Sequence, residues 1–335
     1  DEYLTYKENY PAVRHFGLRM LDRDSTNPVK DMLLLLELVR RYKKIKPDII
    51  LHFTNKPNLY GGIAAWLNGI KSIAIVTGLG YAFIHKGFVR KMMTLMYRLT
   101  AGFHQKFIFE NIEDRELFAQ LGIIAGDKAI SVKGCGVNTT WYHPYPNGKP
   151  KQNTIFTFIG RLLYDKGIRE FVEAARRTKS VRQDTEFWIV GELDAENPAT
   201  VDKDELVRWV DEDVVYYHGF IKDVRNIIAQ SDCIVLPSYR EGLPRIVVEA
   251  MSMAKPVITT LSAGCAETVD EGINGYLVKI KDINGLTNAF LNFLSLPHER
   301  QLDMGSAGRK KAVKEFDDKQ IAQEIYNLII LNGLV

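Results

Sequence analysis

Short apolar runs alternate with longer amphipathic stretches along most of this chain. The run Lys106-Phe-Ile-Phe109 is typical of a buried strand, and Asn111–Leu121 after it has the spacing of a helix. Repeated alternation of this kind predicts doubly wound α/β domains, in which helices cover both faces of a parallel sheet. The predicted strands span residues 47–52, 72–76, 106–109, 130–133, 154–160, 186–190, 214–218, 233–236, 256–259 and 275–278. The predicted helices span 31–44, 61–67, 86–98, 111–121, 245–253 and 316–331, with one more that starts near residue 168.

The segment Trp141–Lys151 interrupts this alternation with several prolines and a glycine, which is typical of a linker. We therefore expect an N-terminal domain over residues 1–147, a C-terminal domain over 148–315 and a final helix within 316–335. A Rossmann-like domain normally opens with a strand, a glycine-rich turn and a helix. None precedes the helix predicted at 31–44, so we expect the initial βαβ portion of the first domain to be missing.

Composition sets the broad class. The 335 residues are 46% hydrophobic and 25% charged, which suits two domains with real cores. No run of eighteen apolar residues and no signal-peptide pattern is visible, so we expect neither a transmembrane helix nor secretion. Cys135, Cys233 and Cys265 are scattered and lack metal-ligand spacing, which predicts reduced thiols in a cytoplasmic protein without a structural metal.

Charge is distributed unevenly. Residues 1–150 carry 21 Lys and Arg against 13 Asp and Glu, whereas the net charge of the whole chain is only +3. The basic half therefore faces something anionic, and a membrane surface or a phosphorylated substrate fits equally well. No recognised nucleic-acid motif is present, so nucleic acid is not expected as a partner.

Two carboxylates lie around the start of a predicted helix in the C-terminal half. Glu241 precedes the helix at 245–253 and Glu249 lies inside it. The N-terminus of a helix has free backbone N–H groups and a partial positive charge, which suits an anion, and carboxylates accept hydrogen bonds from sugar hydroxyls. The Glu-x7-Glu spacing alone is more typical of an ordinary capped surface helix.

Two cations follow the strand at 154–160. Gly160 ends this strand, and Arg161 and Lys166 precede the next helix. Arginine binds phosphate through two parallel hydrogen bonds and lysine adds a point charge, so the arrangement fits a diphosphate site. Taken alone, the two side chains could also be solvated surface cations.

Together these motifs resemble the donor-site signature of retaining, nucleotide-sugar-dependent glycosyltransferases of family 4, also called glycosyl transferases group 1. The resemblance rests on the ordered motifs G-R-x-x-x-x-K-G at 160–167 and E-G-L-P-x4-E at 241–249, and it covers most of the chain. It implies the GT-B fold, which consists of two Rossmann-like domains separated by a cleft. It also implies a final helix that crosses back to the first domain.

The resemblance further implies roles for individual residues. Arg161 and Lys166 would bind the donor diphosphate and stabilise the leaving group, Glu241 would lie beside the donor sugar, and Glu249 would bind the ribose. The remaining donor-side candidates are Gly160, Gly191, Ile221, Gly242, Leu243 and Pro244, and the turn from Gly264 to Glu267 is also expected near the donor. On the acceptor side, the candidates are Thr77, Gly78 and His85. Many relatives have a histidine at the position of Thr77, so an acceptor-side histidine cannot be transferred directly.

The implied reaction is transfer of a hexosyl or N-acetylhexosaminyl group, with retention, from a UDP-sugar to a hydroxyl of a glycan or of a polyprenyl-diphosphate-linked sugar. Capsule, lipopolysaccharide and other glycoconjugate pathways use such steps. No Asp-x-Asp signal of the type that metal-dependent transferases use is present, so we expect no metal cofactor. A UDP-sugar epimerase of the same fold and a catalytically silent nucleotide-sugar-binding protein remain alternatives.

The segment 86–98 predicts a helix with a segregated charge pattern. At 100° per residue, Lys86, Arg90, Lys91, Thr94 and Arg98 share one face, and Phe88, Met92, Leu95, Met96 and Leu99 share the opposite face. A basic amphipathic helix can lie on an anionic membrane, which predicts peripheral attachment to the inner face of the cytoplasmic membrane. An ordinary helix that packs its apolar face on the sheet would show the same pattern.

Overall fold

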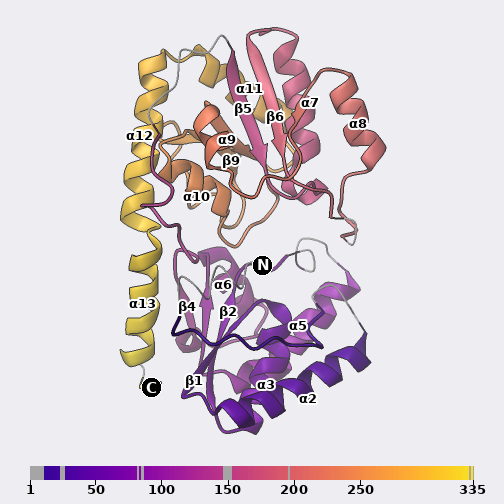
Figure 1. Cartoon of the computed structure of the whole chain (residues 1–335), viewed down its shortest axis with the longest axis vertical. Coiled ribbons are helices and arrows are strands. Elements are labelled where there is room, and N and C mark those ends of the chain that lie inside the picture. The colour runs from indigo at the N-terminus through magenta and orange to yellow at the C-terminus, as the bar shows by residue number, and fades with distance from the viewer. Residues whose placement is uncertain are drawn as a thin grey trace.

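The computed structural model describes residues 11–22, 27–80, 83, 87–145, 153–194, 197–331 and 333–334. They form two α/β domains, one above the other in Figure 1, each built on a parallel sheet. The doubly wound fold predicted from the sequence is therefore confirmed. Residues 146–151 of the predicted linker lie outside the described residues, as do all of 1–10 and 84–86.

The N-terminal sheet has four parallel strands, paired in chain order. They are β1 (Ile49–Phe53), β2 (Lys71–Val76), β3 (Lys106–Phe109) and β4 (Ala129–Ser131). The helical elements of this domain are α2 (Pro28–Ile45), the π-helix η1 (Pro57–Gly61), α3 (Gly62–Leu67), α5 (Phe88–Thr100), η2 (Ala101–Phe103), α6 (Ile112–Gln120) and η3 (Gly126–Lys128). One side of the sheet packs on an aromatic cluster that includes Tyr97, Phe107, Phe109 and Phe118.

The C-terminal sheet has six parallel strands in the order β10-β9-β8-β5-β6-β7. The strands are β5 (Thr154–Ile159), β6 (Thr185–Val190), β7 (Tyr216–Tyr217), β8 (Cys233–Leu236), β9 (Val257–Thr260) and β10 (Gly275–Val278). The helices are η4 (Tyr164–Lys166), α7 (Ile168–Lys179), α8 (Lys203–Asp211), α9 (Arg225–Gln230), α10 (Arg245–Ser252), α11 (Ile283–Ser295), α12 (His298–Glu315) and α13 (Asp318–Leu331). This is the Rossmann strand order, and it reverses direction between β5 and β8, where ligands of such folds usually bind.

The chain passes between the domains twice, and the two passages are hydrogen-bonded to each other. Val137 donates its N–H to the Phe316 carbonyl at 2.8 Å, and Asp318 donates to the Val137 carbonyl at 3.0 Å. Beyond this point α13 runs along the N-terminal domain, and Figure 1 shows α12 and α13 as one column beside both domains. Ile329 of α13 packs on the face of the N-terminal sheet that carries Ile73 and Ile75.

In α2, Leu34 and Leu38 are buried against Ala64 of α3, whereas Met32 and Leu36 are exposed. The run of four consecutive leucines at 33–36 leaves the buried face of this helix undetermined by periodicity. None of the helices in the described ranges combines the length and apolar character that a membrane-spanning segment needs.

Helix α5 does not pack its apolar face on the sheet, which was the alternative to membrane contact. Tyr97 is 1% exposed and donates its hydroxyl to Asn55 at 2.8 Å, and Thr94 and Thr100 are buried beside it. The predicted apolar face is therefore turned to solvent, except for the half-buried Met96. The exposed apolar side chains of α5 are Phe88, Val89, Met92, Leu95 and Leu99. Thr94 does not belong to a solvated basic face.

A candidate nucleotide-sugar site

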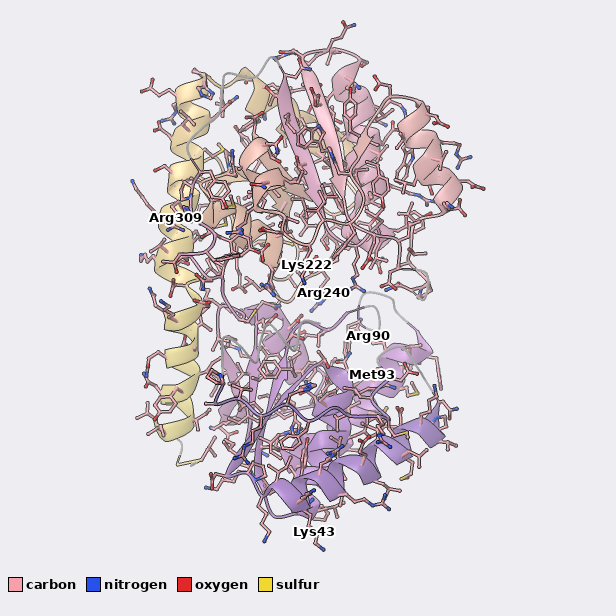
Figure 2. The ribbon with its side chains drawn as sticks, viewed as in Figure 1. Lys43, Arg90, Met93, Lys222, Arg240 and Arg309 are labelled. Atoms are coloured by element: carbon pink, nitrogen blue, oxygen red, sulfur yellow. The ribbon has the colours of Figure 1, made fainter. Side chains whose placement is uncertain are left out.

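A cavity of about 500 Å³ lies where the strand order of the C-terminal sheet reverses. The loops that follow β5, β6 and β8 and the first turn of α10 form its walls. Its lining combines four cations and three carboxylates with apolar and aromatic side chains. The lining residues are Tyr142, Ile159, Gly160, Arg161, Lys166, Val190, Gly191, Glu192, Phe220, Ile221, Lys222, Val224, Leu236, Glu241, Leu243, Pro244, Arg245, Ile246 and Glu249. Lys222 and Arg240, labelled in Figure 2, mark the side of the C-terminal domain that faces the N-terminal one.

Arg161 and Lys166 enter this cavity from the loop after β5. The Arg161 guanidinium is half-exposed, and its Nη1 lies 2.8 Å from Asp194 Oδ2. Lys166 ends η4 and is followed by Gly167, whose φ of +75° suits glycine. A Cβ on Gly167 would lie 2.0 Å from the carbonyl oxygen of Pro237, so glycine lets the two loops meet. The loop after β8 is thereby brought against Lys166.

Lys166 and Glu241 form an ion pair in the cavity. Nζ lies 2.5 Å from Oε1 and 2.7 Å from Oε2, and both side chains are largely buried. The Glu241 backbone N–H also donates to the Ala263 carbonyl at 3.0 Å, which ties its loop to the segment after β9. The pair places a carboxylate and an ammonium at one point, where they can bind hydroxyl and phosphate oxygens of one ligand.

Glu249 lies in α10 and faces the same cavity. It is 7% exposed, and burial raises the pKa of its carboxyl, although nearby Arg245 partly offsets this effect. Arg245 Nη2 lies 3.3 Å from Glu249 Oε1. Tyr142 lies on the other side, where burial and the Glu249 carboxylate raise the pKa of the phenol to about 12. A buried carboxylate on a helix is a fixed acceptor for ligand hydroxyls.

The cavity brings together nine of the predicted donor residues. They are Arg161, Lys166, Glu241, Glu249, Gly160, Gly191, Ile221, Leu243 and Pro244. Gly242 does not line it and instead contacts the N-terminal domain. Glu267, in the turn expected beside the donor, accepts a hydrogen bond from the Ile112 N–H at 2.9 Å and so caps α6.

Sequence reasoning missed several residues of this cavity, notably Tyr142, Lys222 and Arg245. Phe220 is 64% exposed, and such an exposed aromatic ring in a cavity suits stacking on a planar group. Tyr142 lies within the predicted linker, where composition gives no sign of a binding role. Arg245 begins α10, and its nearness to Glu249 follows from their i, i+4 spacing.

The acceptor-side candidates belong to the N-terminal domain. Thr77 and Gly78 follow β2 and reach the loop after β8, since a Cβ on Gly78 would lie 2.8 Å from the Gly242 nitrogen. His85 lies outside the described residues. The role of Thr77 and Gly78 toward an acceptor stays a prediction.

Two stacked Rossmann-like domains with a ligand-sized cavity at the switch point define a GT-B protein, and comparison with known proteins agrees. A model of the family described as "Glycosyl transferases group 1" matches residues 153–295, and one described as "Glycosyl transferase 4-like" matches residues 7–111. Both models describe glycosyltransferases, and the chain is a glycosyltransferase.

Two bacterial relatives match almost the whole chain, each at 28% identity. One, from Campylobacter jejuni, is N,N′-diacetylbacillosaminyl-diphospho-undecaprenol alpha-1,3-N-acetylgalactosaminyltransferase, with 96% of this chain and 88% of the relative covered. The other, from Escherichia coli, is UDP-Gal:alpha-D-GlcNAc-diphosphoundecaprenol alpha-1,3-galactosyltransferase, with 95% and 84% covered.

Solved structures share the fold. Anabaena HepE in complex with UDP and glucose aligns with a TM-score of 0.81 at 19% identity, over 98% of this chain and 88% of HepE. Sucrose-phosphate synthase from Thermosynechococcus elongatus aligns with a TM-score of 0.80 at 20% identity, over 96% of this chain and 84% of the synthase. The GT-B fold predicted from the sequence is confirmed.

Proposed function

We propose that this glycosyltransferase transfers a hexosyl or N-acetylhexosaminyl group from a UDP-sugar to a hydroxyl of a sugar carried on a polyprenyl diphosphate. The proposal rests mainly on one observation. Arg161, Lys166, Glu241 and Glu249 all face the same cavity at the strand-order switch point. The two cations can pair with the diphosphate, and the two carboxylates can accept hydrogen bonds from the hydroxyls of the sugar and the ribose.

The donor would lie along the cavity in a definite direction. Arg161 and Lys166 bind the diphosphate, Glu249 accepts hydrogen bonds from the ribose hydroxyls, and Glu241 accepts them from the donor sugar. Phe220 and Ile221 at the far end suit the face of a base. Two relatives act on undecaprenyl-diphosphate-linked sugars according to their names, and one of these names specifies UDP-Gal. These names support UDP as the nucleotide and a lipid-linked acceptor.

Retention of configuration is part of the proposal. Both relatives are named alpha-1,3 transferases, and the galactose of UDP-Gal is α-linked, so an α product corresponds to retention. The acceptor hydroxyl attacks the anomeric carbon as the bond to the diphosphate breaks, and the leaving phosphate takes the hydroxyl proton. Arg161 and Lys166 stabilise the negative charge that develops on the diphosphate. Because two cations already do this, we propose that no metal ion is required.

Attachment to a membrane completes the proposal, and α5 would make the contact. Phe88, Met92, Leu95 and Leu99 recur at helical spacing and are 79%, 39%, 55% and 69% exposed. The helix also carries Arg90 and Lys91, and a row of apolar side chains beside cations suits an anionic bilayer surface. A lipid-linked acceptor would be presented at such a surface.

Product analysis tests the function directly. Purified protein is incubated with UDP-, GDP- and ADP-sugars and with short polyprenyl-diphosphate-linked N-acetylhexosamines, and products are identified by mass spectrometry and NMR. We expect transfer from a UDP-sugar with an α linkage. Release of an epimerised UDP-sugar without transfer would instead establish the epimerase alternative. Binding without any turnover would favour a nucleotide-sugar-binding protein.

A further inference from the structure

The beginning of α6 in the N-terminal domain contacts the loop that carries Glu241 in the C-terminal domain. We call residues 110–114 the α6 start and residues 240–243 the donor loop. Both are fully described, and they belong to different domains that meet here. Arg240, labelled in Figure 2 at the boundary between the domains, lies at this contact.

Asn111 makes the central contact through both ends of its amide. Its Oδ1 accepts the Asp114 N–H at 2.7 Å and so caps α6. Its Nδ2 donates to the carbonyl oxygens of Glu241, at 3.2 Å, and Gly242, at 3.0 Å. The side chain is 1% exposed, so its orientation is fixed by partners on both sides. An asparagine can act as acceptor to one element and donor to another, whereas serine or aspartate would keep only the cap.

Two further contacts hold the ends of the donor loop. Arg240 Nη2 pairs with the fully buried Asp114 carboxylate. The Leu243 backbone N–H donates toward the buried carboxyl of Glu110, whose pKa burial raises to about 7. Gly242 lies between these contacts, and a Cβ there would lie 2.4 Å from Glu110 Oε2 and 2.5 Å from the Thr77 carbonyl oxygen. The close approach of the two segments therefore depends on glycine at this position.

We infer that the α6 start is the positioning element of the donor-sugar site. It fixes the backbone on both sides of Glu241, so that the Glu241 carboxylate stays against Lys166 and can bind the sugar. The inference rests on the proposed function and deepens it, because it makes the donor-sugar site a joint product of both domains. Diphosphate and ribose contacts, by contrast, come from the C-terminal domain alone. Glu110, Asn111 and Asp114 are positioning residues and touch no substrate.

Asn111→Asp tests this division, because it preserves the cap of α6 and removes the amide donor. The turnover number for transfer should fall by roughly tenfold or more, the size expected for two lost hydrogen bonds, while the Kd of UDP stays within about twofold. Hydrogen exchange at the Leu243 amide should become faster. Asn111→Ser should behave in the same way without adding a charge, and it replaces the Asp variant if that one does not fold.

Lys133→Met is the matched control. It removes the Lys133–Glu315 ion pair, which links the segment after β4 to α12 at 3.1 Å and does not involve a donor-loop residue. We expect unchanged turnover, UDP affinity and Leu243 exchange in this variant. Equal loss of UDP affinity and turnover in the Asn111 variants, or unchanged turnover and exchange, would overturn the inference. If the wild-type protein transfers no sugar at all, the proposed function fails, and the exchange and UDP measurements still decide whether Asn111 positions the loop.

Discussion

Lys166 and Glu241 lie on different loops, 75 positions apart in the chain, and share a two-point ion pair with Nζ–Oε distances of 2.5 and 2.7 Å. The pair joins the group expected at the diphosphate to the group expected at the sugar. The nucleotide-sugar donor must therefore bind beside Lys166 and Glu241, which already form an ion pair with each other, or insert between them. Binding of the diphosphate and orientation of the sugar are coupled through this contact.

Removal of either cation should weaken UDP binding. Arg161→Ala and Lys166→Ala each remove a charge-assisted hydrogen bond to the diphosphate. Such a bond is worth roughly 1.5–3 kcal/mol, which corresponds to about a tenfold to hundredfold rise in the Kd of UDP. Isothermal titration calorimetry with UDP measures the change. Arg169→Ala is the control, since Arg169 pairs with Glu205 and does not line the cavity. Unchanged UDP affinity in both Arg161 and Lys166 variants would remove the donor-site assignment.

The two carboxylates should separate nucleotide from sugar recognition. Glu249→Ala should weaken UDP and the UDP-sugar alike, because the ribose is common to both ligands. Glu241→Ala should leave UDP affinity closer to that of the wild type and should reduce UDP-sugar affinity and turnover. Titration of each variant with both ligands distinguishes these effects. Wild-type UDP affinity in the Glu249 variant would contradict its ribose role.

Activity should not depend on a divalent metal. We expect transfer by the purified protein to survive dialysis against EDTA, because Arg161 and Lys166 supply the positive charge that a metal would otherwise bring. Initial rates are compared with and without EDTA and after addition of Mg²⁺ or Mn²⁺. A strict requirement that either ion restores would show that the two cations are insufficient.

Glu110 should make folding stability depend on pH near neutrality. Its pKa rises from 4.5 to about 7, chiefly through burial and also through the charges of Asp114 and Glu241, which Arg245 and the Leu243 N–H oppose. Between these two pH values the folded protein keeps a proton that the unfolded chain releases, so this stabilising contribution is complete below about pH 4.5 and is lost as pH rises through about 7.

The variant Glu110→Gln should abolish that component. The difference in free energy of unfolding, variant minus wild type, should increase by up to roughly 3 kcal/mol as the pH rises from about 4.5 to about 7. Urea titrations at several pH values measure the difference. A constant difference across this range would mean that Glu110 is not protonated in the folded protein.

The exposed row of α5 should mediate membrane binding. Phe88→Ser and Leu95→Ser together should reduce co-sedimentation with anionic vesicles, because they remove apolar area that inserts between lipids. Lys91→Glu should reduce it in a salt-dependent way, since each cation near such a surface contributes about 1 kcal/mol. Leu331→Ser is the control, since Leu331 is 82% exposed on α13. Equal binding to neutral and anionic vesicles, or no loss in the α5 variants, would remove the membrane proposal.

Much of this architecture follows from local sequence signals. The strands at 106–109, 233–236 and 275–278 have the predicted bounds, because compact apolar runs between turn residues leave little choice of position. The donor residues were predictable because they lie at strand ends and helix starts, which the strand order of a parallel sheet brings to one edge.

The sequence carries no comparable local signal for the contacts between domains. Asn111 looks like an ordinary helix cap in the sequence, and its second role depends on the donor loop more than a hundred residues away. The sequence pattern of α5 left open whether its apolar face meets a membrane or packs on the sheet, and the structure turns that face to solvent. Buried Tyr97 and Thr94 instead satisfy their hydroxyls with Asn55 and the Arg90 carbonyl.

The hydrogen bonds that join Val137 to Phe316 and Asp318 have a mechanical consequence. Two separate tethers between bodies would allow sliding and twisting, but two tethers fastened together at one place act as a single pivot. Gly136 reinforces the fastening, since a Cβ there would lie 2.8 Å from the Phe316 carbonyl oxygen. We therefore expect relative movement of the domains to be mainly a rotation about this point. Such a rotation would strain the contacts of Asn111 with the donor loop, while α13 stays packed on the first sheet.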